Sequence, residues 1–388
     1  MQRARDHGFP FSGTPGVLNA ITDVAGVEVG YSTLWEGEGL LDVGRGPVRT
    51  GVTAILPRGR EDPAPCFGAW ATLNGAGEMT GTIWLDERGL CEGPVLITNT
   101  HAVGVVRDAA IQWMRRQKYE FLFALPIVAE TYDGLFNDID GGHVKPEHVF
   151  QALDGARGGP IAEGNVGGAT GMMTYEYKGG AGTASRMLPI DQGGYTVGVL
   201  VQSNFGERRS LRIAGLKVGE HLADDRPRLA SPELLPKDRA HNYARWISGA
   251  EQPQDQIGAG DGSIIVVVAT DAPLLPHQLK RLAKRPGLAI GRLGGVGAAL
   301  SGDIFLALST ANADVSEMGG AKPVLHHANL NMTALFEAVI DATEEAIVNA
   351  LVAGEAAEGA DRFLIPALPI ERVKAMLAEH KLLTQRNN

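Results

Sequence analysis

The dipeptide Gly262-Ser263 stands where two very different stretches of the chain meet. Residues 252–262 before it are polar and rich in glycine, and residues 264–269 after it are apolar and mostly β-branched. A serine held at the start of a rigid strand, behind a residue without a Cβ, is well placed to attack its own preceding carbonyl group. A turn glycine followed by a strand-opening serine is the common structural interpretation of such a pair. The pair alone leaves both interpretations open.

Three other polar side chains stand at the ends of apolar runs. Ser301 and Asp303 precede the run at residues 304–308, and Asn204 follows the run at residues 195–202. Side chains at strand ends converge in a layered α/β fold, where they can form a site. Each of them taken singly is more typical of a cap or a turn.

Glu130 and Tyr132 follow the apolar run that ends at Ala129. Polar groups in this position are common both in turns and in binding sites. The sequence favours neither interpretation for this pair.

Several classes of function are excluded by pattern and composition. The glycine-rich segment at residues 164–172 lacks the lysine of a P-loop and the preceding strand of a dinucleotide-binding fold, so nucleotide binding is not expected. A net charge of -10 without a basic run argues against a nucleic-acid binder. Cys66 and Cys91 have no metal-ligand spacing and are expected to be buried free thiols.

The chain is expected to be cytoplasmic and not bound to a membrane. Residues 1–8 carry basic residues but are not followed by the apolar region of a secretory signal. No apolar run approaches the 18 or so residues of a membrane-spanning helix.

Apolar periodicity indicates a fold of strands followed by helices, with sheets inside and helices outside. The segment at residues 82–85 is expected to follow a tight connection between strands, and residues 211–218 to return as the antiparallel neighbour of 195–202. From residue 219 to 262 the pattern lapses into a long polar excursion. The expected strands are 51–56, 94–98, 121–129, 195–202, 264–269 and 304–308, and the expected helices are 102–116, 273–285 and 331–352.

One family resemblance joins these observations. The segment at residues 262–274, GSIIVVVATDAPL, is similar to the self-cleavage motif of the peptidase family that contains the L-aminopeptidase/D-esterase and the β-peptidyl aminopeptidases. Shorter supporting stretches lie at 19–24, 74–85, 130–138, 164–172, 201–206 and 301–310, so that the resemblance runs from about residue 10 to about residue 355.

The resemblance implies a precursor that cuts itself between Gly262 and Ser263 into an α chain, 1–262, and a β chain, 263–388, which stay associated as one domain. It implies a four-layer αββα sandwich, similar in layering to the N-terminal nucleophile hydrolases but differently connected. It also implies assembly as a homotetramer.

The resemblance further implies a role for each site residue. Ser263 would be the nucleophile, and its new α-amino group, which titrates near pH 7.7 to 8.0, would act as its base. Ser301 would relay or orient protons, and Asp303 would hold Ser301 and the Ser263 ammonium, at a position where some relatives carry glutamate. Asn204 would stabilise the oxyanion. Gly262, as a glycine, can take strained backbone angles that expose its carbonyl group.

The implied activity is that of a serine aminopeptidase acting on short peptides, amides or esters without a metal or an organic cofactor. Tyr132 is expected to line the pocket or to orient the substrate amine, and Glu130 to supply a carboxylate for a substrate ammonium. Two alternatives stay open. The first is an acyltransferase similar to the ornithine acetyltransferases, although these carry threonine at the cut, and the second is an uncleaved, non-catalytic binder of small molecules.

Overall fold

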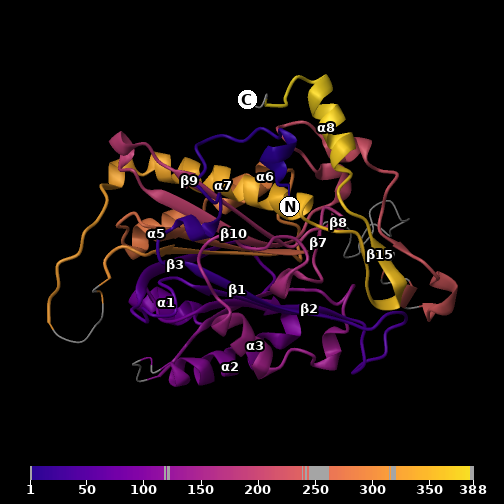
Figure 1. Ribbon diagram of the computed structural model, residues 1–388, viewed down its shortest axis with the longest axis horizontal. Helices are drawn as coiled ribbons and strands as arrows, with labels where there is room; N and C mark the ends of the chain where they lie inside the picture. The colour runs from indigo at the N-terminus through magenta and orange to yellow at the C-terminus, as the bar shows by residue number, and fades with distance from the viewer. Residues whose placement is uncertain are drawn as a thin grey trace.

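The protein is a stack of four layers in which two sheets lie between two layers of helices (Figure 1). The computed structural model describes residues 2–117, 119, 123–237, 239–240, 243, 262–313, 315 and 320–384. The αββα sandwich predicted from the sequence is confirmed.

The smaller sheet has the strand order β1-β2-β5-β6, with β5 and β6 parallel and the other neighbours antiparallel. A right-handed crossover through a helix is the usual way to join two parallel strands, and α2 makes that connection here. The strands are β1 (Glu28–Glu36), β2 (Val48–Leu56), β5 (Val95–Asn99) and β6 (Ile127–Thr131).

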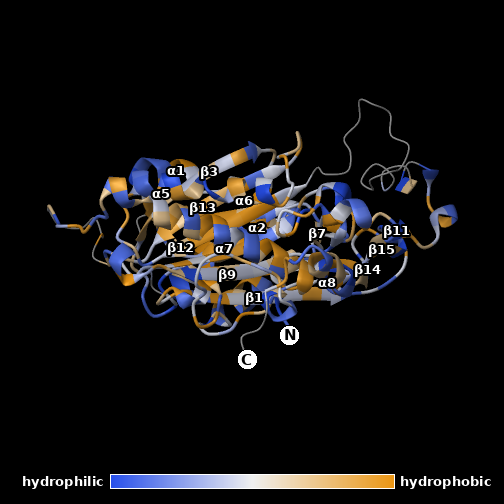
Figure 2. Cartoon of the chain, turned by 90° about the horizontal axis from the view of Figure 1, so that it is seen from above, coloured by the Kyte–Doolittle hydropathy of each residue, from blue (hydrophilic) through white to orange (hydrophobic). Residues whose placement is uncertain are grey.

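The larger sheet has the strand order β4-β3-β13-β12-β10-β9. Its two central strands, β12 and β13, are parallel to each other, and both are buried along their whole length. These two strands carry mostly hydrophobic residues (Figure 2). The strands are β3 (Cys66–Gly75), β4 (Leu90–Cys91), β9 (Ala181–Met187), β10 (Thr196–Asn204), β12 (Ser263–Thr270) and β13 (Gly302–Ser309).

Helices cover the outer face of each sheet (Figure 1). The helix α7 packs on β9 and β10, while α2 and α3 cover the smaller sheet. A Cβ at Gly182 in β9 would lie only 2.0 Å from the carbonyl oxygen of Ala346 in α7, so the close approach of this helix requires glycine there. The helices are α1 (Thr82–Arg88), α2 (Val103–Arg116), α3 (Pro146–Asp154), α5 (Pro276–Ala283), α6 (Pro286–Arg292), α7 (Thr333–Val352) and α8 (Ile370–Glu379).

The apolar run of β12 serves two cores because successive side chains leave opposite faces of a strand. Val266 belongs to the same buried core as Val339 of α7, between sheet and helices. Val267 belongs to the same buried core as Ile97 of β5, between the two sheets. Each such fully buried side chain contributes about 1.5–3 kcal/mol. The sequence prediction of a strand buried on both faces is confirmed.

Five short strands lie at one end of the sandwich. Met173–Thr174 (β7) pairs with Tyr177–Lys178 (β8), and Phe363–Ile365 (β15) pairs with Ala357–Glu358 (β14) and with Arg228–Leu229 (β11). The part of the polar excursion that is described, from residue 219 to 237, is therefore tied to the body of the protein through β11. Most of its remainder lies outside the described residues.

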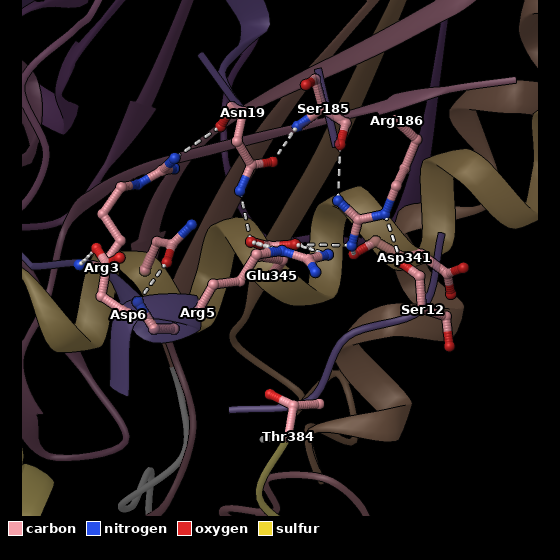
Figure 3. A network of polar contacts seen from close by, with 12 residues as sticks. Arg3, Arg5, Asp6, Ser12, Asn19, Ser185, Arg186, Asp341, Glu345 and Thr384 are labelled. Carbon is pink, nitrogen blue, oxygen red and sulfur yellow. Dashed lines mark hydrogen bonds and ion pairs between the residues drawn. The ribbon is translucent and has the colours of Figure 1, made fainter. Parts of the chain in front are cut away.

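A buried polar network fastens the N-terminal segment to β9 and α7 (Figure 3). The carboxylate of Glu345, which is fully buried, accepts hydrogen bonds from Arg5 at 2.7 and 2.8 Å and lies 2.8 Å from Nη2 of Arg186. Arg186 also donates to the carbonyl groups of Ser12 and Asp341. One buried carboxylate thus pairs with two guanidinium groups, that of the buried Arg186 and that of the partly exposed Arg5.

Two expectations about local structure are wrong, and the strand expected at 121–129 begins only at Ile127 among the described residues. Residues 82–85 belong to helix α1, whose start at Thr82 follows Gly81 in a left-handed conformation (φ 75°). Residues 211–218 form turns, and the neighbours of β10 are β9 and β12. The edge of β10 that was expected to pair with residues 211–218 pairs instead with β12, which lies much further along the chain.

Both cysteines are buried free thiols, as expected. Among the described residues, the helices are too short or too polar to cross a bilayer.

Candidate active site

A cavity of about 450 Å³ opens at the end of the sandwich where β10, β12 and β6 terminate or begin. Five of the residues singled out in the sequence line it: Glu130, Tyr132, Asn204, Gly262 and Ser263. Their convergence follows from the fold, because the strands that carry them meet at this edge from two different sheets.

Ser263 is the first residue of β12 and is only 5% exposed. It is paired with Asn204 on β10 and with Gly302 on β13. The N–H group of Gly302 donates to the Ser263 Oγ atom at 3.3 Å and to the carbonyl oxygen of Gly262 at 2.9 Å. The serine hydroxyl is therefore held at the inner wall of the cavity.

Close packing explains why residue 262 is a glycine. A Cβ on this residue would lie 2.1 Å from the carbonyl oxygen of Asn204 and 3.0 Å from the Cα of Phe205. The close approach of β10 leaves no room for a side chain before Ser263.

Ser301 and Asp303 form a pair beside the cavity, with the Ser301 hydroxyl donating to Asp303 Oδ1 at 2.7 Å. Asp303 pairs in register with Ile264, one position beyond Ser263 and Gly302. Because successive side chains alternate between the faces of a sheet, the Asp303 carboxyl group lies on the face opposite to the Ser263 hydroxyl. The Asp303 carboxyl group and the Ser263 hydroxyl group therefore do not face each other across the strand pair.

The second carboxylate oxygen of Asp303 is buried and has no hydrogen-bond partner among the described residues. Burial raises the pKa of Asp303 to about 6, and the hydrogen bond from Ser301 acts in the opposite direction. A carboxylate in this state favours a nearby cation.

The side chain of Asn204 is fixed by two backbone groups. Its amide nitrogen donates to the carbonyl oxygen of Tyr132 at 2.8 Å, and its oxygen accepts from the N–H group of Met173 at 2.8 Å. These bonds hold the amide at the cavity wall beside Ser263.

Glu130 is a buried carboxyl group at the end of β6 and is 4% exposed. It accepts hydrogen bonds from the backbone N–H group of Glu78 at 2.9 Å and from the hydroxyl group of Thr100. Burial raises the pKa of Glu130, although both hydrogen bonds favour the charged form. Tyr132 is 40% exposed and is the more accessible of the two.

The sequence missed several cavity residues. Asp133 is fully buried, lines the cavity, and has a pKa raised by burial to about 6. Its position between Tyr132 and the polar residues that follow was the only available signal. Ile365 arrives from β15, more than 100 residues beyond Ser263 in the chain, and nothing in its local sequence marks it.

The glycine-rich segment at residues 164–172 forms part of the cavity wall through Gly171. The ammonium group of Lys178, which is fully buried, donates to the carbonyl oxygens of Thr170 and Met172 on either side of it, at 2.9 and 2.6 Å. Burial lowers the pKa of Lys178 to about 7. The segment is thus a braced turn that positions Met173 for its bond to Asn204.

Among the described residues, no three His, Cys, Asp or Glu side chains converge as ligands for a metal ion.

Comparison with known proteins places the whole arrangement in one family. The profile of peptidase family S58 matches residues 19–364. The chain belongs to peptidase family S58. Family S58 is a family of aminopeptidases, which supports the resemblance noted in the sequence.

The relatives cover almost the whole chain. The beta-peptidyl aminopeptidase BapA of Sphingosinicella microcystinivorans is 54% identical over 98% of this chain and 93% of its own. The solved structure of the L-aminopeptidase D-Ala-esterase/amidase from Ochrobactrum anthropi is 43% identical, covers 99% of this chain and 100% of its own, and superposes with a TM-score of 0.86. That structure is described as a new variant among the Ntn hydrolase fold.

A beta-aminopeptidase from a Burkholderia species is 44% identical, with a TM-score of 0.82, over 97% of this chain and 99% of its own.

Proposed function

We propose that this S58 protein is an aminopeptidase that cuts its own chain between Gly262 and Ser263 and then uses Ser263 as its catalytic nucleophile. The observation that carries the proposal is the place of Ser263. Its hydroxyl lies at a cavity wall, directly beside its own preceding carbonyl group and opposite Asn204.

In the self-cleavage, the Oγ atom of Ser263 bonds to the carbonyl carbon of Gly262 and the peptide C–N bond breaks. The hydroxyl proton passes to the departing nitrogen. Water then hydrolyses the resulting ester, which leaves a carboxylate on Gly262 and a free amine and hydroxyl on Ser263. The fragments have 262 and 126 residues, by subtraction from 388.

In substrate turnover, the new α-amino group of Ser263 takes the proton of its own hydroxyl as the hydroxyl oxygen bonds to the substrate carbonyl carbon. The bond from that carbon to the leaving amine or alcohol breaks, and the proton passes to the leaving group. Water then hydrolyses the acyl-serine to a carboxylic acid and free Ser263. A free α-amino group titrates at about 7.7 to 8.0, so a useful fraction is unprotonated near neutral pH. Asp303, with one carboxylate oxygen unpaired, supports the protonated amine from the other side of the sheet, and Ser301 orients Asp303. Asn204 donates its amide to the oxyanion after exchanging its bond to Tyr132.

A buried carboxylate and several apolar side chains in the cavity lining support a substrate class. Glu130 receives the free ammonium group of the substrate, and Tyr132 orients it. Leu135, Phe136 and Ile365 receive the first side chain. The substrates are short peptides, amides or esters with a free N-terminus, and they include chains that begin with a β-amino acid, as the names of the relatives suggest.

A denaturing gel of the purified protein tests the proposal. We expect two fragments in a mass ratio of about 2:1, whereas a single band at 41.0 kDa would point to an uncleaved binder. Ser263→Ala should remain uncut and inactive. Ser309→Ala is the matched control, and this variant should be cut and active. Ser309 is also a buried strand serine, but it lies away from the cavity, and its hydroxyl donates to the carbonyl oxygen of Ala272 at 2.6 Å.

Product partition separates hydrolase from transferase. Addition of an amine acceptor should leave free carboxylate as the main product, and predominant transfer to the amine would instead identify an acyltransferase. Light scattering tests the tetramer that the family resemblance implies.

A further inference from the structure

One backbone N–H group contacts both atoms that react in the proposed self-cleavage. The N–H group of Gly302 donates to the carbonyl oxygen of Gly262 at 2.9 Å and lies 3.3 Å from the Oγ atom of Ser263. The first contact is also the opening rung of the parallel ladder between β12 and β13. The scissile carbonyl group is therefore part of the sheet itself.

We infer that the Gly302 N–H group is the oxyanion donor for self-cleavage, so that the first rung of the β12–β13 ladder acts as a catalytic group. This inference rests on the proposed cut between Gly262 and Ser263. In this inference a backbone group of β13, and not the side chain of Asn204, stabilises the oxyanion that forms during self-cleavage.

The charge that develops in the reaction falls on the atom that Gly302 already contacts. As the Ser263 oxygen bonds to the Gly262 carbonyl carbon, the electron pair of the C=O double bond moves onto the carbonyl oxygen. The hydrogen bond from Gly302 then becomes a bond to an anion, which is shorter and stronger than a bond to a neutral carbonyl. The donor needs no rearrangement, because both strands of the pair are buried and held in register.

The absence of a side chain at residue 302 fits this role. A Cβ there would lie 2.7 Å from the carbonyl oxygen of Ala76 and 3.0 Å from Ser263 Oγ. Glycine at this position lets the hydroxyl group of Ser263 lie against the backbone of β13.

The other obvious donor is engaged elsewhere in the uncut chain. The amide nitrogen of Asn204 donates to Tyr132, and its oxygen is held by Met173. The part of Asn204 that approaches Gly262 is its backbone carbonyl oxygen, which lies 2.1 Å from the position a Gly262 Cβ would take and cannot donate. Self-cleavage and substrate turnover thus use different donors.

A backbone ester at position 302 removes this N–H group without adding a side chain. Glycolic acid is incorporated at residue 302 during cell-free translation, and the appearance of the two fragments is followed on a gel at neutral pH. The matched control is the α-hydroxy analogue of threonine at position 310. The N–H group of Thr310 donates to the carbonyl oxygen of Thr270 at 2.9 Å, at the opposite end of the same strand pair.

We expect the 302 ester to cut itself about 100- to 1,000-fold more slowly than the all-amide chain, and the 310 ester to cut itself at nearly the normal rate. In the Ser263→Ala background the two esters should have similar melting temperatures, since each loses one rung of the ladder. A normal cutting rate for the 302 ester would overturn the inference. Equal slowing by both esters would also overturn it, because the cause would then be a weakened ladder.

The all-amide chain separates this inference from the proposed function. If that chain stays uncut, the proposed function fails; if it cuts and the 302 ester cuts equally fast, only the role of Gly302 fails.

Discussion

Asn204 and Ser263 oppose each other directly across the antiparallel pair β10–β12, at the last residue of one strand and the first residue of the other. This register places an amide group and a hydroxyl group at the same cavity wall without any loop between them and the sheet. Sites held on regular strands are more rigid than sites held on loops, so the backbone positions that carry both groups are fixed.

Asn204→Asp should lower kcat for substrate hydrolysis about 100- to 1,000-fold with little change in KM, because it removes an oxyanion donor and keeps the acceptor for Met173. Steady-state kinetics on the cut protein measure the effect. Asn312→Asp is the control, because Asn312 also donates to one backbone carbonyl and accepts from one backbone N–H group, both of Leu325. A raised KM with unchanged kcat would mean that Asn204 binds the ground state and the transition state equally well, which would contradict its role as an oxyanion donor.

Glu130→Gln should lower kcat/KM for substrates with a free amine about 10- to 100-fold, since a hydrogen bond to a charged group is worth about 1.5–3 kcal/mol. In the unmodified protein, the carboxyl group takes up a proton as the pH falls through its raised pKa, and its attraction for the substrate ammonium is lost. That acidic limb should be missing from the pH profile of the variant. Asp133→Asn provides the comparison, because a larger loss in that variant would make Asp133 the ammonium site.

Asp303→Asn should remove a pH dependence from the stability of the uncut protein. The pKa of Asp303 is raised from 3.8 to about 6, so its neutral form favours the folded state. The stability it contributes is present below pH 3.8 and is lost as the pH rises through about 6. The loss amounts to about 3 kcal/mol.

Urea unfolding of Ser263→Ala with and without Asp303→Asn, at pH 3.5 and pH 7, measures the difference. Asp133 titrates in the same window but is common to both proteins. An identical pH dependence in the two proteins would show that Asp303 does not carry the effect.

Glu345→Gln should destabilise the protein by about 3–5 kcal/mol, because it leaves the buried guanidinium of Arg186 and its neighbour Arg5 without a carboxylate. Glu344→Gln is the neighbouring control. Glu344 pairs with the half-exposed Arg292 at 3.1 Å, and its loss should cost about 1 kcal/mol or less. Thermal unfolding of both variants measures the difference in stability. Equal losses of stability would contradict the prediction that the buried ion pairs of Glu345 contribute more than the exposed pair of Glu344.

The sequence predicted the elements whose signal is local. The apolar run of β12 and the hydrophobic stripe of α7 are both visible within about 20 residues, and both are confirmed. The antiparallel return at 211–218 was wrong because β10 pairs instead with β12, about 60 residues further along the chain. Local patterns carry no information about such partners.

For the candidate site, the residue types at strand ends were visible, but their assembly rested on the family resemblance. The periodicity of β13 places Asp303 on the face opposite to Ser263 only once the register of the pair is known. The need for glycine at 262 likewise arises from the approach of Asn204, a contact across strands. The placement of Asp303 and the need for glycine at residue 262 depend on the register and packing of strands that are distant in the sequence, so local patterns could not predict them.

The place of β12 and β13 in the middle of the larger sheet fixes when a cut before Ser263 can happen. The segment from 263 onward supplies both central strands, while the earlier part of the chain supplies β3 and β4 on one side and β9 and β10 on the other. Neither part has a complete sheet alone, so the donor on β13 meets Gly262 only in a finished fold. A cut before Ser263 would therefore follow folding, and the two chains would stay associated through the sheet that they share.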